Sequence, residues 1–255
     1  MHLKLNISNV QSNLTYNDIE TEYQPIDNGS IVTCGKDSTI IKDKSHAELS
    51  INEFAEKIQD STVKLESVEI NICNNVKKQN RRDIFNSLLK VFQAKSSKLH
   101  VSKCILGDLF AQEILLLLPF FQAGEFETIE LSNNESMVGQ LNEISKLEQW
   151  KKAKILNAAN GKFEIPIENL FHFEKFTISL TSFSKEDSKK IKDRLYEMEH
   201  FGDGCFIFPK TNIIEIARVF DSNFYLGESA LFDCEVNYKC FIVEITERFF
   251  KIRKG

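Results

Sequence analysis

The strongest constraint in the sequence is a regular alternation of short strand-like runs with amphipathic helical stretches. Five strand-like runs lie at 68–72, 99–101, 128–131, 154–156 and 176–180. Helical stretches separate them, at 84–92, at 109–118 before Pro119, and at 137–150, and another follows Ser184, which opens a capping box with Asp187. This order predicts an α/β chain in which helices connect parallel strands.

The spacing of these runs equals one strand–helix unit, which is the repeat length of solenoid proteins. No strict leucine-rich consensus is visible in the sequence. Two architectures therefore stay open: a degenerate strand–helix repeat that is leucine-rich-repeat-like, or an ordinary open parallel sheet.

The two ends of the chain differ from this middle part. The start predicts strands at 3–7, 19–23 and 31–34, a tight turn at Asn28-Gly29 and a helix over 46–59. The end predicts an antiparallel meander over 231–238, 241–246 and 248–252 that covers the last edge of the sheet. We expect a β-rich segment with its helix at 1–62 and an α/β domain at 63–255, continuous with each other.

Composition narrows the class of protein. The chain is 42% hydrophobic with 21 phenylalanines, which is ample for a packed interior, and 32 basic against 37 acidic residues give a net charge of −5. No excess of cations is available to neutralise phosphates, and no apolar run is long enough to cross a bilayer. We expect a soluble cytoplasmic or nuclear chain with reduced cysteines and protein partners, and neither nucleic acid nor membrane as a partner.

No residue pattern in the sequence supports catalysis. The loop at 29–37 has the wrong glycine spacing for a nucleotide, and Asp37 stands where a metal-binding hydroxyl belongs. The five histidines are scattered, so we expect no metal, and we expect no cofactor. His172 is either a general base or a core residue, and the flanking Phe171 and Phe173 favour the core. Cys205 has no activating neighbour in the sequence. The chain is expected not to be an enzyme.

One basic cluster, at 77–82, has two interpretations. It is either a nuclear-import or phosphate-binding patch, or a solvated loop and helix start, and the second interpretation is favoured.

A distinctive stretch at 147–154 resembles the signature of the FTH domain of nematode F-box proteins. The residues that carry the resemblance are Leu147, Glu148, Gln149, Trp150, Lys151 and Ala153. The segment 167–174, with His172 and Phe173, is similar to a second family block, although Leu170 stands where Phe is usual, and 118–131 resembles a third. We expect Trp150 in the core, at the end of a helix that carries Leu141, Ile144 and Leu147.

The resemblance implies a module that recognises the substrate of an SCF-type ubiquitin ligase. In such proteins the F-box docks on a Skp-type adaptor and opens with a Leu-Pro motif, whereas here Leu118-Pro119 lies deep in the chain. The chain is therefore expected to be a truncated product or a divergent member, and the adaptor is a partner only if an F-box lies outside this chain. The alternative is a free-standing interaction or competitor protein without a ligase role.

Polar residues alternate with apolar ones along the predicted strands, which predicts a polar face on the sheet. These polar residues are Glu69, Asn71, His100, Ser102, Thr128, Glu130, Thr177 and Ser179. The candidate partner-binding residues among them are Glu69, Thr128, Glu130 and Ser179. The alternatives are that these positions are merely solvated, or that the C-terminal meander around Tyr238 binds the partner.

Overall fold

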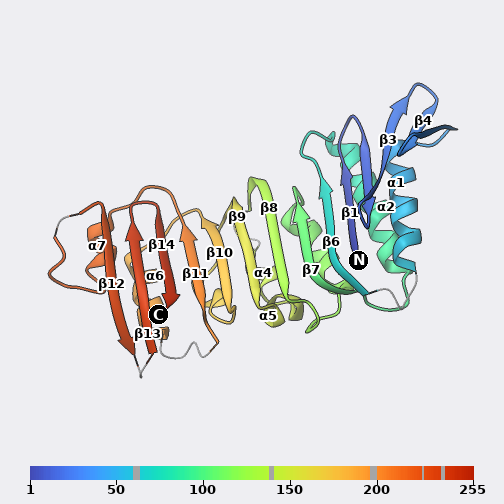
Figure 1. Ribbon diagram of the computed structural model, residues 1–255. Helices are drawn as coiled ribbons and strands as arrows, with labels where there is room; N and C mark the ends of the chain where they lie inside the picture. Colours follow the sequence, from blue (N-terminus) through green and yellow to red (C-terminus); the bar gives the residue numbers. More distant parts are fainter. Residues whose placement is uncertain (60–63, 138–140, 196–199, 226, 237–238) are drawn as a thin grey trace. The chain divides into compact units, whose positions relative to one another are not determined.

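The structure is a computed structural model that describes residues 1–59, 64–137, 141–195, 200–225, 227–236 and 239–255 (Figure 1). It divides into two compact units. Unit 1 comprises residues 1–132 and 147–152, and unit 2 comprises residues 133–146 and 153–255. Each unit contains its own open arrangement of strands with helices, so the mixed α/β class is confirmed.

The strands of unit 1 combine a parallel part with an antiparallel part. Their bounds are β1 His2–Ile7, β2 Ser12–Tyr16, β3 Ile19–Ile26, β4 Gly29–Cys34, β5 Asp37–Lys42, β6 Lys64–Ile72, β7 His100–Gly107 and β8 Thr128–Met137, of which 128–132 belong to this unit. Strands β1, β6, β7 and β8 lie side by side and parallel. Strands β1 to β5 form an antiparallel meander.

The helices of unit 1 cover one face of these strands (Figure 1). They are α1 His46–Gln59, α2 Lys78–Ala94, α3 Ala111–Leu117, the 3-10 turn η1 Leu118–Phe120, and α5 Glu148–Lys152. Helix α1 lies over β1 to β4 and against α2. Phe54, Phe92, Phe121 and Phe126 form a row of buried rings whose neighbouring centroids lie 5.8 to 5.9 Å apart. Aromatic burial of this extent dominates the stability of a small core.

Unit 2 repeats the parallel arrangement and ends in a meander. Its strands are β9 Ile155–Phe163, β10 Lys175–Leu180, β11 Asp203–Ile207, β12 Ser229–Val236, β13 Lys239–Thr246 and β14 Phe249–Lys254. Strands β9, β10 and β11 are parallel, and β14 adds to β11 antiparallel before β13 and β12. The predicted C-terminal meander on the last sheet edge is therefore confirmed.

The helices of unit 2 are short, and one has a complete capping box. They are α4 Leu141–Ile144, η2 Ile167–Leu170, α6 Lys185–Arg194 and α7 Ile213–Ala217. At the start of α6 the Asp187 N–H donates to Ser184 Oγ at 3.1 Å, and the Ser184 N–H donates to Asp187 Oδ2 at 2.8 Å. The capping box predicted from the sequence is confirmed.

The structure contains most of the helices and strands that the sequence predicts, but the prediction of one helix was wrong. The helix expected over 137–150 is instead the end of β8 at Met137 followed by the separate short helices α4 and α5. After α4 the Ser145 hydroxyl donates to the Asn142 carbonyl at 2.8 Å, so a side chain competes with the helical backbone pattern there. The strand–helix repeat and the domain boundary at residue 62 stay predictions.

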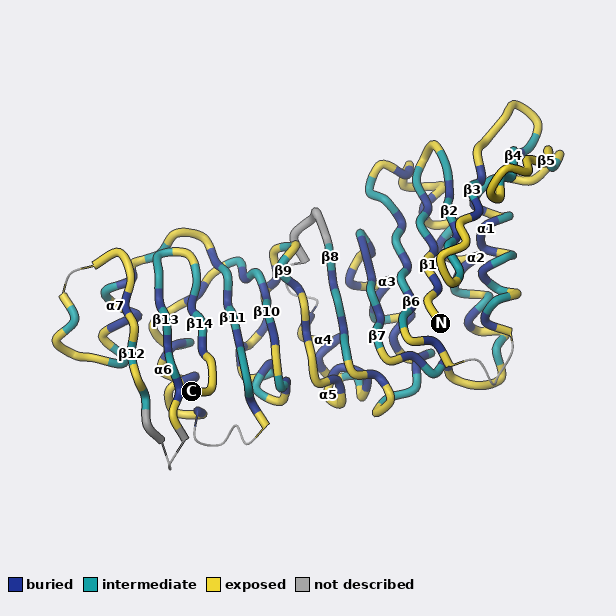
Figure 2. Tube along the Cα trace, in the orientation of Figure 1, coloured by how far each residue is buried: buried dark blue, intermediate teal, exposed yellow. Residues whose placement is uncertain are grey.

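Burial alternates along the strands of both units (Figure 2). On β1, Leu3, Leu5 and Ile7 are buried whereas His2 and Lys4 are exposed. Because successive strand residues point to opposite faces, the helices of each unit bury one face of its strands and leave the other face uncovered.

Trp150 lies fully buried in α5, as the sequence predicted for its ring. Trp150→Ala is expected to lower the free energy of unfolding by about 3–5 kcal/mol, because truncating a large core side chain loses burial and leaves a cavity. Urea denaturation measures the change. The neighbouring exposed Lys151→Ala serves as control and should change stability by less than about 1 kcal/mol. Equal stability of the two variants would contradict a core role for Trp150.

Candidate protein-interaction surface

The uncovered face of the parallel strands in unit 1 is the candidate functional site. We call it the open face. It consists of the outward side chains of β1, β6, β7 and β8: His2, Lys4, Asn6, Ser67, Glu69, Asn71, Lys103, Ile105, Thr128 and Glu130. These positions alternate with buried apolar residues, for example Val68 and Ile70 on either side of Glu69. Strand geometry therefore presents them all to one side.

Opposite charges pair across the strands of the open face. Lys4 and Glu69 are register partners, and Lys4 Nζ lies 2.8 Å from Glu69 Oε1. Lys103 Nζ lies 2.9 Å from Glu130 Oε2 on the next strand. Exposed ion pairs of this kind contribute about 0–1 kcal/mol each, so they do not explain the stability of the sheet. They can open at low cost to meet the polar groups of a partner.

A shallow hollow of about 340 Å³ lies at one end of the open face. Its walls include Ser67, Lys103, Ile105 and Thr128. His2 lies at its edge, with Nδ1 2.8 Å from Ser67 Oγ and Nε2 3.3 Å from a Glu66 carboxylate oxygen. The hollow offers hydrogen-bonding groups around one apolar side chain, which suits a polypeptide better than a small apolar ligand.

Three of the four predicted partner-binding residues lie together. Glu69, Thr128 and Glu130 are all on the open face, whereas Ser179 is on β10 of unit 2 and partly buried there. Thr177 shares that strand with Ser179. Tyr238 lies outside the described residues. Whether any of these residues binds a partner stays a prediction.

Two further predicted polar positions lie at the start of β7. Ser102 is exposed, and His100 is partly buried. His100 Nδ1 lies 2.7 Å from a carboxylate oxygen of Glu125, and this hydrogen bond lowers the pKa of Glu125.

The residues of the family-like motif mainly build the core. Trp150, Gln149 and Ala153 are buried, and Gln149 Nε2 donates to the Phe121 carbonyl at 2.9 Å. Leu147 is partly buried, and Glu148 pairs with Lys151 at 3.1 Å on the surface. These residues therefore contribute to core packing rather than to a reactive or binding site.

The prediction that His172 lies in the core was wrong, because its side chain is exposed. Ile167 and Leu170 of the 3-10 turn η2 are buried, and so is Phe173 just after it, whereas His172 in the turn that follows η2 is exposed with its ring against Phe173.

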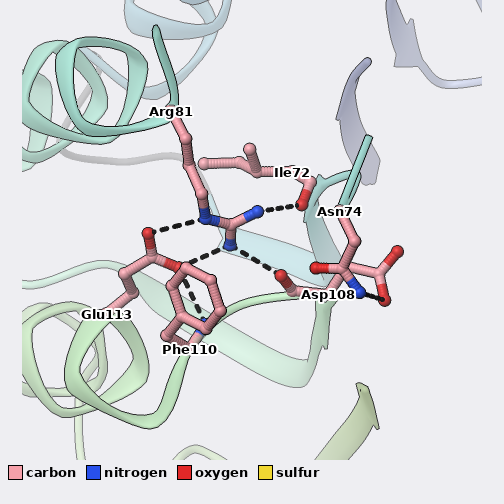
Figure 3. Close-up of polar contacts among 6 residues, drawn as sticks. All are labelled: Ile72, Asn74, Arg81, Asp108, Phe110 and Glu113. Atoms are coloured by element: carbon pink, nitrogen blue, oxygen red, sulfur yellow. Dashed lines mark hydrogen bonds and ion pairs between the residues drawn. The ribbon is translucent and has the colours of Figure 1, made fainter. Parts of the chain in front are cut away.

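A buried ion pair is the feature that sequence reasoning missed (Figure 3). Arg81, only 3% exposed, lies in α2, and its Nε and Nη2 donate to the Glu113 carboxylate at 3.1 and 2.6 Å. Its Nη1 donates to the carbonyl of Ile72 at 2.7 Å, and Nη2 also donates to the carbonyl of Asp108 at 2.6 Å. The guanidinium thus joins two helices to the ends of β6 and β7.

The same contacts correct the interpretation of the basic cluster at 77–82. Lys77, Lys78 and Arg82 are exposed, as a solvated helix start requires, but Arg81 is not. The available signal was Glu113, a carboxylate inside the apolar run 109–118, because a charge on a buried helix face needs a counter-ion. No sequence signal pointed to the two strand-end carbonyls.

Phe110 completes the surroundings of Arg81. Its ring centroid lies 4.3 Å from the guanidinium carbon, and its backbone N–H donates to Glu113 Oε2 at 2.8 Å (Figure 3). The ring packs against the guanidinium, and the backbone N–H holds Glu113 in place at the start of α3.

Removing one partner of this pair should be strongly destabilising. Arg81→Met leaves the Glu113 carboxylate buried without its counter-ion, and we expect the free energy of unfolding to fall by about 3–5 kcal/mol. The double variant Arg81→Met with Glu113→Gln should recover part of that loss, because no unpaired charge remains. Chemical denaturation of both variants measures this.

The adjacent exposed Arg82→Met is the matched control and should change stability by less than about 0.5 kcal/mol. A loss in Arg81→Met no larger than in Arg82→Met would show that the pair does not hold the helices to the strands.

Among the residues that the structure describes, no group of three or more His, Cys, Asp or Glu side chains is placed to hold a metal ion. Within the same residues, no helix combines the length and apolar character needed to span a bilayer.

Comparison with known proteins gives one family and one curated relative. The FTH domain family model matches residues 82–223, more than half of the chain. F-box A protein 224 of Caenorhabditis elegans is 26% identical over 212 residues, which cover 79% of this chain and 54% of that relative. The chain therefore spans about half the length of the curated relative it matches. No solved structure matches the chain.

Proposed function

The chain belongs to the FTH domain family, and from this premise we propose that it is a non-enzymatic protein-interaction module that contacts its partner through the open face. The observation that carries the proposal is the helix-free side of β1, β6, β7 and β8, where the charges of Lys4, Glu69, Lys103 and Glu130 are paired rather than of one sign. A surface balanced in this way suits a protein partner, because phosphate recognition needs a net excess of cations.

The state of the thiols supports a non-enzymatic role. Burial raises the pKa of Cys104, Cys205 and Cys234, and burial together with the nearby Asp108 carboxylate raises the pKa of Cys73. Because the thiolate is the nucleophile, these four cysteines are poorly suited to covalent catalysis at neutral pH.

We further propose that the partner is the target of an SCF-type ubiquitin ligase. The support is the similarity to F-box A protein 224 over 79% of this chain. In that arrangement the chain holds the target, and an F-box beyond the matched region docks on the adaptor. The placement in the cytoplasm or nucleus is part of this proposal.

A free-standing or competitor module is the second candidate, because the Leu-Pro pair within this chain is not accessible to an adaptor. The Leu-Pro pair at 118–119 lies in η1, where Leu118 is fully buried, so it cannot present an adaptor-docking motif. Capture assays with a purified Skp-type adaptor separate the two candidates. The protein is tagged in a nematode and purified together with any segment that flanks this chain. Adaptor capture by that protein would support the ligase role, and target capture without adaptor would support the competitor role.

The open face is tested by the charge reversals Glu69→Lys and Glu130→Lys made together. Both replace an ion pair with a like-charge pair, so capture of the target from a nematode lysate is expected to fall by roughly tenfold. The free energy of unfolding should fall by less than about 2 kcal/mol, because exposed pairs contribute little. Quantitative affinity capture and urea denaturation measure the two effects.

The control with the same change in charge is Glu186→Lys with Glu228→Lys, two exposed positions of unit 2. Capture that survives the open-face reversal, yet is lost when Tyr238 is changed, would move the recognition surface to the C-terminal meander.

A further inference from the structure

A second surface of unit 1 lies between α2 and α3, on its helices rather than on its open face. A groove of about 430 Å³ runs there, and its lining includes Lys78, Arg82, Phe85, Phe110 and Leu116. The polar lining residues Arg81 and Glu113 form the buried ion pair described above. The other lining residues are apolar, cationic or, at Asn86 and Gln112, polar without charge, so none of them carries a negative charge.

The apolar floor of the groove is unusually open to solvent. Phe110 is 39% exposed and Leu116 is 44% exposed, while Phe85 closes the base between them and the core. Large apolar side chains gathered in a hollow and rimmed by polar residues mark interaction sites, whereas isolated exposed ones do not.

The rim of the groove is positively charged. Lys78 and Arg82 are exposed, and the part of the chain that the structure describes records no ion pair for either. The groove's carboxylate, Glu113, is neutralised by Arg81 at 2.6 Å. In a chain with a net charge of −5, this groove is a local cationic site.

The length of the groove indicates which kind of ligand fits into it. On α2 its lining runs from Lys78 to Asn86, a span of roughly 12 Å at the rise of an α-helix. That is about two helical turns, which matches the apolar positions i, i+3 or i+4, and i+7 of an amphipathic helix laid into a groove.

We propose that this groove binds an acidic amphipathic helix of a protein partner. Its apolar face would pack on Phe110 and Leu116, and its carboxylates would meet Lys78 and Arg82. A nucleic acid fits less well, because two cations give few phosphate contacts. The proposal extends the proposed function by adding a contact, and it uses none of the open-face residues.

The probe is a phage-displayed library of random peptides, selected on the full chain. We expect enriched peptides to be net acidic and to carry apolar residues at helical spacing. A labelled peptide of the most enriched sequence should bind the Lys78→Glu, Arg82→Glu double variant at least about tenfold more weakly than the natural chain. Leu116→Asp should weaken binding to a similar degree through the apolar floor.

Two control variants distinguish binding in this groove from a general effect of net charge and from binding at the open face. Lys36→Glu with Lys42→Glu changes the net charge equally at exposed positions around β5 and should leave peptide binding unchanged, as should Glu69→Lys with Glu130→Lys. Thermal melting confirms that each variant is folded. The proposal is overturned if enriched peptides are neutral or basic, if no peptide is enriched, if binding survives both groove changes, or if a single-stranded oligonucleotide of mixed sequence competes for the groove.

Discussion

One-sided coverage of parallel strands is the constraint on which the functional argument depends. In unit 1 the helices bury alternate residues over 3–7 of β1, 68–72 of β6 and 104–106 of β7, and the aromatic row from Phe54 to Phe126 packs between helices and strands. The residues on the other face must then tolerate solvent, and most of them are polar, with charges paired across strands. The side chains on this uncovered face do not pack in the core, so they are available to contact a partner.

The buried Arg81–Glu113 pair links that architecture to the helices. Ion pairs in the interior rarely add net stability, but they fix geometry because any other arrangement leaves a charge unpaired. Here the guanidinium also satisfies the carbonyls of Ile72 and Asp108, so α2 and α3 have one position relative to the strand ends. Arg81 and Glu113 also line the groove between those two helices, and Lys78 and Arg82 are the cations that remain exposed in it. The buried ion pair thus helps to determine the shape of the groove on the surface.

The sequence predicted the fold best where patterns are local. Helix α1 matches its predicted bounds, and the capping box of α6 and the final meander were also found. Strands β2, β5 and β11 were not predicted. Leu14 is the buried apolar residue of β2, and β5 is largely exposed, so neither strand has an alternating apolar signal. Arg81 and His172 were misplaced for another reason. Their burial is set by distant carbonyls and by a 3-10 turn, which neighbouring sequence letters do not specify. Glu69, Thr128 and Glu130 were brought together because they share the predictable period of parallel strands.

The central claim, that the open face is where a protein partner sits, is tested most directly by site-specific photo-crosslinking. A photoreactive amino acid replaces Thr128 on the open face in one variant and the exposed Lys185 on α6 in another, and both are irradiated in a nematode extract. We expect a discrete crosslinked partner from position 128 that is absent from position 185 and is lost when the charges of Glu69 and Glu130 are reversed. A partner that crosslinks equally from both positions, or from position 185 alone, would contradict it.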